Sequence, residues 1–155
     1  MAVLVNKLDP EFKYEVAAQP GGENIKSCFA CGVCTGGCPI SERDENFDPR
    51  KIIRMVLLGM KKRVLSSDFI WYCLHCNTCS FHCPQDVRFA DIMNVLQDMA
   101  VKEGYVHSSF PKQIRKIGEL SLDLRRAMIL EVVPKKSQEV SIDPKELLDK
   151  VRGKV

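Results

Sequence analysis

Apolar residues recur at helical spacing in two stretches of the chain, and each stretch follows a segment rich in cysteine. The first stretch begins at Asp48-Pro49, a pair that typically caps and opens a helix. Its apolar positions are Ile52, Ile53, Val56, Leu57, Met60 and Val64, and its polar side carries Lys51, Arg54, Lys61 and Lys62. The second stretch ends before Gly104, and its apolar positions are Ile92, Val95, Leu96 and Met99. Because no β pattern interrupts these stretches, we predict an all-α fold built from two units, each a cysteine-bearing loop followed by an amphipathic helix.

The two ends of the chain have a different character. Residues 1–22 contain two prolines and a pair of glycines after a short apolar start, which predicts an irregular N-terminal arm. A central domain is expected over residues 23–105. Residues 106–155 predict a helical C-terminal extension, with one helix over about Pro111–Leu130 and a second beginning at Asp143-Pro144. Periodicity leaves open whether this extension docks onto a larger subunit or only completes the core.

All eight cysteines of the chain lie in two short segments that share one spacing. The first segment contains Cys28, Cys31, Cys34 and Cys38 and ends with Pro39. The second segment contains Cys73, Cys76, Cys79 and Cys83 and ends with Pro84. Each residue of the second segment lies 45 positions after its counterpart in the first, from 28 to 73 and likewise through to the prolines. Five residues in one register constitute an internal repeat.

This spacing is typical of cubane iron–sulfur clusters, each of which needs four thiolates at the corners of a tetrahedron. Cysteines separated by two residues on a tight loop can bring three sulfurs around one cluster. In two-cluster ferredoxins with the run C-x₂-C-x₂-C-x₃-C-P, the fourth cysteine of each run ligates the other cluster. This rule assigns Cys28, Cys31, Cys34 and Cys83 to cluster 1, and Cys73, Cys76, Cys79 and Cys38 to cluster 2. We therefore expect two [4Fe–4S] clusters, each anchored in both segments.

Other chemistries fit the cysteine pattern less well. Zinc also binds C-x₂-C pairs, but a structural zinc site uses four ligands, whereas each run here has a further C-x₂-C step and a Cys-Pro. A disulfide framework would need an oxidising compartment, to which nothing in the sequence points. A three-iron cluster at one of the two sites stays open as a variant, although no expected ligand is missing.

Several residues inside and beside the second segment are weaker candidates. His75 and His82 could tune the neighbouring cluster, but we favour solvated or packed imidazoles because four cysteines already complete the site. Trp71 and Tyr72 are expected to cover the site rather than to relay electrons. The first loop is rich in glycine and the second is not, so the two clusters should differ in reduction potential. The methionines are expected to pack in the core.

Charge and motif content exclude several functional classes. The formal net charge is +3, but two oxidised clusters with their thiolates would bring it to about −1, which gives no argument for nucleic-acid binding. Apolar stretches such as Met55–Leu58 are far shorter than the roughly 20 residues that cross a bilayer. The first residues lack a secretory signature, so we expect a cytoplasmic protein without direct membrane insertion. No nucleotide or flavin motif is present, which indicates an electron conduit without catalytic residues of its own.

The two cysteine segments resemble a known family. The stretches Cys28–Ile40 and Ile70–Val87, together with the intervening Pro49–Gly59, are similar to the C-type iron–sulfur subunit of heterodisulfide reductase. The resemblance spans roughly residues 21–104, about half of the chain. It implies an α-helical ferredoxin fold, with the eight cysteines in the ligand roles given above and no departure from the family's pattern.

The resemblance also implies partners and a reaction. In that family, the A-type subunit, which bears flavin and clusters, passes electrons through the C-type subunit to the cysteine-rich, catalytic B-type subunit, which reduces a mixed disulfide. Two alternatives stay open at this point. One is the small iron–sulfur subunit of another dehydrogenase complex of the glycerol-3-phosphate, lactate or succinate/fumarate type, and the other is a zinc-stabilised interaction module. The co-purifying subunits distinguish the first alternative, and iron against zinc content distinguishes the second.

Overall fold

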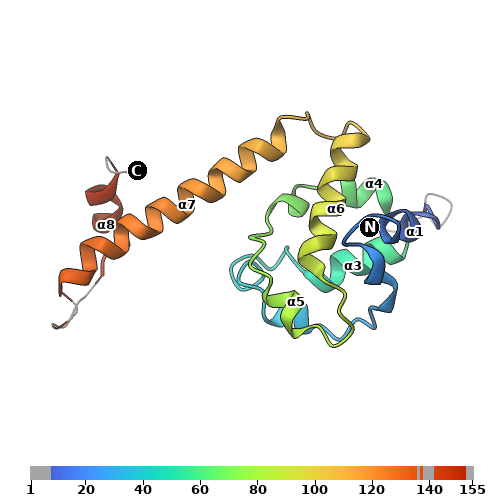
Figure 1. Cartoon of the computed structure of the whole chain (residues 1–155), viewed down its shortest axis with the longest axis horizontal. Coiled ribbons are helices and arrows are strands. Elements are labelled where there is room, and N and C mark those ends of the chain that lie inside the picture. The colour runs from blue at the N-terminus through green and yellow to red at the C-terminus, as the bar shows by residue number, and fades with distance from the viewer. Residues whose placement is uncertain (1–7, 136, 138–141, 153–155) are drawn as a thin grey trace. The chain divides into compact units, whose positions relative to one another are not determined.

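The computed structural model describes residues 8–135, 137 and 142–152, and every regular element within them is helical (Figure 1). The chain divides between Ser108 and Ser109 into two compact units. The first unit contains α1 (Phe12–Ala17), η2 (Glu23–Ser27), α2 (Val33–Gly36), α3 (Pro49–Leu57), α4 (Lys61–Leu65), η3 (Asp68–Trp71), α5 (Thr78–His82) and α6 (Phe89–Lys102). The second unit contains α7 (Phe110–Val132), η4 (Val133–Lys135) and α8 (Pro144–Val151). The predicted all-α fold is confirmed.

The core of the first unit is formed where α1 packs against α3 and α6, and where α4 joins the latter two helices (Figure 1). The apolar positions predicted for α6 are buried, and Ile92 and Leu96 have no exposed surface at all. On α3 the same holds for Val56. Because burial of one such side chain contributes roughly 1.5–3 kcal/mol, these helices are held together mainly by their apolar faces. The expected core packing of methionines is confirmed for Met93 and Met99.

The prediction of an irregular arm over residues 1–22 is wrong for residues 8–22, the part of that segment that the structure describes. Phe12–Ala17 form helix α1, and the side chains of Phe12 and Val16 are completely buried. The two prolines and the glycine pair lie on either side of this helix rather than within it. A six-residue helix is too short to be predicted from periodicity, and it is stable here because its apolar side chains complete the core.

The single helix predicted from Asp48 to Val64 is divided in the structure into α3 and α4. The Asp48 cap is confirmed, since its side chain accepts the backbone N–H of Lys51 at 3.1 Å. Helix α3 ends at Leu57, two residues before Gly59, which has φ +75°. The N–H groups of Gly59 and Met60 bond back to Val56 and Met55 at 2.9 Å each, which satisfies the last carbonyls of the helix. Gly104 ends α6 in the same way, at φ +76°, as predicted.

Gly59 also lies against the chain that precedes α1. Its carbonyl accepts the N–H of Asp9 at 2.7 Å. A Cβ atom at position 59 would lie 2.2 Å from the Asp9 carbonyl oxygen. The close approach of two backbone segments therefore requires glycine here, beyond the requirement for positive φ.

Lys61 holds three elements together, although the sequence pattern assigned it to the polar side of a helix. Its Nζ lies 2.7 Å from Glu15 of α1 and 2.8 Å from Glu103 at the end of α6. Partial burial lowers the pKa of Lys61, but the hydrogen bonds and charges of Glu103 and Glu15 outweigh this effect and raise the pKa above its usual value. The ammonium group is therefore charged at neutral pH and ties α1, α4 and α6 at one point.

The second unit consists of the long helix α7 and the shorter α8, which pack on each other. The helix predicted over Pro111–Leu130 is confirmed, with one further residue at its start and two at its end. The second predicted start is confirmed as well, because Asp143 accepts the N–H of Lys145 at 2.8 Å. The helix α7 itself has no buried side chain. Among the described helices, none combines the length and the apolar character needed to cross a bilayer.

Candidate metal centres

The internal repeat of the sequence is also a repeat of backbone conformation. Each cysteine segment follows a short 3₁₀ helix, η2 or η3, and passes into a short α-helix, α2 or α5. Ala30 and its counterpart His75 have φ of 59° and 50°, and Gly32 and its counterpart Asn77 have φ of 88° and 60°. Left-handed conformations at non-glycine residues cost about 1–2 kcal/mol each and persist where a site requires them. The two cysteine loops therefore have the same backbone conformation at equivalent positions.

Packing of α2 against α5 brings the two cysteine segments together and leaves two pockets. The first pocket is lined by three cysteines of the first segment, Cys28, Cys31 and Cys34, and by two of the second, Cys79 and Cys83. Apolar side chains including Val33, Ile53, Val87 and Phe89 complete its walls. The second pocket reverses the pattern and is lined by Cys73, Cys76, Cys79 and Cys38. All eight predicted cysteines therefore line these two pockets, and each pocket takes thiols from both segments.

The two pockets share a wall. Cys79 and Phe89 line both of them, and the ring of Phe89 is 2% exposed. The volumes of the pockets, measured to include the space at their mouths, are similar, at about 360 Å³ for the first and about 320 Å³ for the second. Two groups bound in these pockets would therefore be neighbours that both contact Cys79 and Phe89.

Backbone N–H groups donate to the thiols in both pockets. The His75 N–H lies 3.4 Å from Cys73 Sγ, and the Val87 N–H lies 3.4 Å from Cys83 Sγ. Cys76 Sγ and Thr78 Oγ1 share a hydrogen bond at 3.4 Å, and this bond lowers the pKa of Cys76. Donors aimed at sulfur are the means by which a protein stabilises thiolate ligands and sets a cluster's potential.

Burial has the opposite effect on the pKa values of three thiols. It raises the pKa of Cys34 to about 11 and that of Cys73 to about 11, and neighbouring cysteines add to both shifts. Burial also raises the pKa of Cys79. Thiols gathered so closely resist forming thiolates unless a cation compensates their charge. A positively charged inorganic core bound by these thiols would offset this cost.

The donor set of each pocket fits a [4Fe–4S] cluster. At least four cysteine thiols and an apolar lining surround each space. In the described part of the chain, no three His, Cys, Asp or Glu side chains converge as they would on one metal ion. The thiols stand around each pocket rather than at one point.

Polar contacts fasten the first loop to the helix that follows it. Thr35 Oγ1 donates to the N-cap carboxylate of Asp48 at 2.6 Å and accepts the N–H of Arg50 at 3.1 Å. The guanidinium of Arg50 lies beside Gly32, where a Cβ atom would be 3.4 Å from Nη1. Arg50 lines the first pocket, whereas no charged side chain lines the second. This difference is the clearest electrostatic distinction between the pockets.

The weaker candidates are distributed differently. Trp71 is 8% exposed and belongs to the core, while Tyr72 is largely exposed with its ring centre 6.5 Å from that of Phe47. His75 is half-buried, and burial lowers the pKa of its imidazole, whereas His82 is exposed. It is the backbone of His75, not its ring, that bonds to a thiol. Sequence reasoning missed Asn24, Arg50 and Val87, for which only proximity to the cysteine segments could have given a signal.

Comparison with known proteins also indicates a domain that binds two iron–sulfur clusters. A family model described as a 4Fe-4S dicluster domain matches residues 25–88. The C subunit of the H(2):CoB-CoM heterodisulfide,ferredoxin reductase of Methanothermobacter thermautotrophicus is 32% identical over 136 residues, covering 82% of this chain and 72% of the relative. The C subunit of the Ferredoxin:CoB-CoM heterodisulfide reductase of Methanosarcina mazei is 36% identical over 79% of this chain and 73% of its own length.

A third relative is more similar over a shorter region. The iron-sulfur subunit (C 2) of the CoB–CoM heterodisulfide reductase of Methanocaldococcus jannaschii is 46% identical over 82 residues, which are 53% of this chain and 43% of the relative. The similarity in the first two relatives therefore extends beyond the half of the chain in which the motifs lie.

Proposed function

The chain belongs to the family of heterodisulfide reductase C-type subunits, and we propose that it relays electrons from a flavin-containing A-type subunit to a disulfide-reducing B-type subunit. It is an iron–sulfur electron-transfer subunit of an oxidoreductase complex, with two [4Fe–4S] clusters and a non-catalytic role. Its partners are other subunits of such a complex. We propose both the identity of these two partners and the relay of electrons between them.

We propose the ligand sets from the observation that carries the function, namely two cysteine-lined pockets that have Cys79 in common. Cluster 1 is bound in the first pocket by Cys28, Cys31, Cys34 and Cys83, and cluster 2 is bound in the second by Cys73, Cys76, Cys79 and Cys38. The crossed pattern of pocket linings supports this assignment over one in which each segment serves one cluster. Each cluster supplies storage for one electron at a time.

The residues of the chain make such a relay work in three ways. Cys79 and Phe89 keep the two sites adjacent and dry, which favours transfer between them. The N–H groups of His75 and Val87 stabilise thiolates and so adjust the potentials. Cys31 and Cys76, which occupy equivalent places in the repeat, are the two exposed cysteines. We propose that electrons enter beside one of these cysteines and leave beside the other.

We further propose that residues 106–155 dock the protein onto its partners. The apolar side chains of Ile117, Leu120 and Leu122 on α7 are more than half exposed, and the sequence similarity to relatives covers more of the chain than the cluster-binding segments. We also propose a cytoplasmic location, because cysteines that ligate clusters must stay reduced and that compartment keeps thiols reduced.

Purification of the untagged complex from its host under strict anoxia tests the relay. We expect a flavin-bearing subunit and a cysteine-rich, disulfide-reducing subunit to co-purify, and the chain itself to contain about eight irons, four for each cluster. Reduction of the flavin-bearing partner should be followed by reduction of the clusters in this chain and then by disulfide reduction. A partner set from a glycerol-3-phosphate or lactate dehydrogenase would contradict the proposal, and so would a chain that binds zinc and no iron.

We expect Arg50→Gln to lower the midpoint potential of cluster 1 by about 20–60 mV, because a cation beside the site stabilises its more negative, reduced state. The substitution keeps most of the side-chain length and removes the charge. The shift should be measured by redox titration followed by electron paramagnetic resonance. Raising the ionic strength should reduce it, since Arg50 is exposed and its charge is screened.

Arg54→Gln provides the matched control for this prediction. Arg54 lies one turn further along α3, is exposed, and does not line the first pocket. The same change of charge should therefore shift the potential by less than half as much. Equal shifts in the two variants would refute a specific role of Arg50, as would a shift confined to cluster 2.

A further inference from the structure

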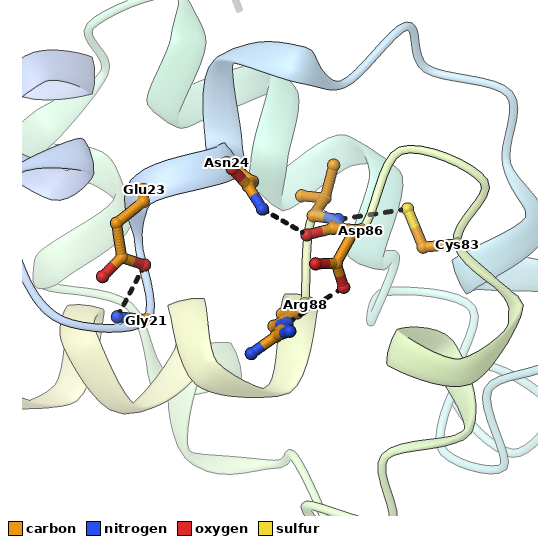
Figure 2. Close-up of polar contacts among 7 residues, drawn as sticks. Gly21, Glu23, Asn24, Cys83, Asp86 and Arg88 are labelled. Atoms are coloured by element: carbon orange, nitrogen blue, oxygen red, sulfur yellow. Dashed lines mark hydrogen bonds and ion pairs between the residues drawn. The ribbon is translucent and has the colours of Figure 1, made fainter.

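One peptide group connects Cys83 to a residue that precedes the first cysteine segment. The N–H of this peptide belongs to Val87 and lies 3.4 Å from Cys83 Sγ. Its carbonyl belongs to Asp86 and accepts a hydrogen bond from Asn24 Nδ2 at 3.0 Å. Figure 2 shows the two bonds in line, with Asn24 on one side of the peptide and Cys83 on the other.

The backbone around this peptide is held in an uncommon conformation. Asp86 and Arg88, which flank Val87, have φ of 49° and 52°. Residues other than glycine adopt this region at a cost, so local contacts must hold it. The carboxylate of Asp86 pairs with Arg88 at 2.9 Å, and the turn before Asn24 is closed by a 2.9 Å bond from the Gly21 N–H to Glu23 (Figure 2). Asn24 joins the two turns across 62 residues of sequence.

A peptide held at its carbonyl has a fixed N–H direction, and a donor bonded to that carbonyl also polarises the N–H. Without Asn24, the Asp86–Val87 peptide could turn and its N–H could leave Cys83. The amide of Asn24 therefore acts on the thiol through the peptide and does not touch it.

We propose that Asn24 is a positioning residue that sets the reduction potential of cluster 1 through the Asp86–Val87 peptide and Cys83. This inference rests on the proposed ligand set. Electron density on the Cys83 thiolate is stabilised by the Val87 N–H, and more strongly in the reduced cluster, which carries one more negative charge. The residue thereby couples the segment before Cys28 to the one ligand of cluster 1 that comes from the other half of the repeat.

Asn24→Ala tests the proposal in the anaerobically purified, cluster-loaded chain. We expect about eight irons, as in the unaltered chain. The equilibrium constant for reduction of cluster 1 should fall about three- to tenfold, which corresponds to the typical contribution of one hydrogen bond. For a one-electron couple, a tenfold change corresponds to 59 mV. The second midpoint should not move. Cys31→Ser identifies the signal of cluster 1, because Cys31 lines only the first pocket.

Two further variants make the outcome decisive. Asn46→Ala removes an amide whose contacts are with Asp44 in a local turn, so both midpoints should stay unchanged. Asn24→Gln retains an amide donor. It should therefore recover part of the midpoint potential, or part of the iron content, that Asn24→Ala loses. Unchanged midpoints in an iron-loaded Asn24→Ala protein would overturn the inference, and so would a shift of the cluster 2 signal. A chain without iron in the unaltered form would instead overturn the proposed cofactors.

Discussion

Cys83→Ala should abolish cluster 1 and leave cluster 2 in place, although Cys83 belongs to the same segment as three cluster 2 ligands. The expected result is a fall from about eight irons to about four and the loss of one of the two paramagnetic signals. The physical reason is that Cys83 lines the first pocket with Cys28, Cys31 and Cys34, and its thiol receives the Val87 N–H there. Iron analysis and electron paramagnetic resonance of anaerobic protein measure both quantities.

Cys38→Ala is the reciprocal variant and should abolish cluster 2 instead. Cys38 lines the second pocket and not the first, although its neighbours in sequence serve the first. The pair of variants is informative because each changes one thiol at the same position of the repeat. If Cys83→Ala removed the signal that Cys76→Ser perturbs, each segment would bind its own cluster and the crossed ligand sets would be wrong.

Gly59→Ala should destabilise the first unit by about 3–5 kcal/mol. Adopting a φ of +75° costs an alanine about 1–2 kcal/mol. The added Cβ would also lie 2.2 Å from the Asp9 carbonyl oxygen, which forces the backbone before α1 away from α3. The midpoint of thermal unfolding should fall by roughly 15–30 °C for a unit of this size, measured anaerobically by circular dichroism and by loss of the visible absorption of the clusters.

Gly104→Ala separates the two contributions. Gly104 has φ +76°, ends α6 with the same hydrogen-bond pattern, and has open space where a Cβ would be added. Only the conformational cost of about 1–2 kcal/mol should appear in this variant. Equal losses of stability in the two variants would mean that the contact with Asp9 contributes nothing.

The sequence was sufficient for the features that repeat or alternate. The shared spacing of the cysteine runs predicted two clusters, and the apolar periodicity predicted the buried faces of α3 and α6. Helix caps at Asp48 and Asp143 and the stop at Gly104 were predicted because these residue types have strong local preferences. Periodic and local signals of this kind do not depend on the rest of the fold.

Features that depend on distant contacts could not be predicted in the same way. Helix α1 is stable because Phe12 and Val16 enter a core formed by later residues. Gly59 ends a helix that its sequence could have continued, since a glycine inside an apolar pattern is compatible with either outcome. Asn24 has no local signal, because its partner lies 62 residues away. Pairs of this kind become visible only when the chain has been folded.

The crossed linings of the two pockets have a consequence for how the molecule is made. On the ribosome, Cys28, Cys31 and Cys34 emerge well before Cys83, since corresponding thiols are 45 residues apart and the fourth ligand follows later still. At typical elongation rates this interval lasts roughly 2–10 s. During it, under the proposed ligand sets, each cluster still lacks at least one of its four thiols. We therefore expect both sites to be filled in the same late stage of biogenesis, after both segments have been translated.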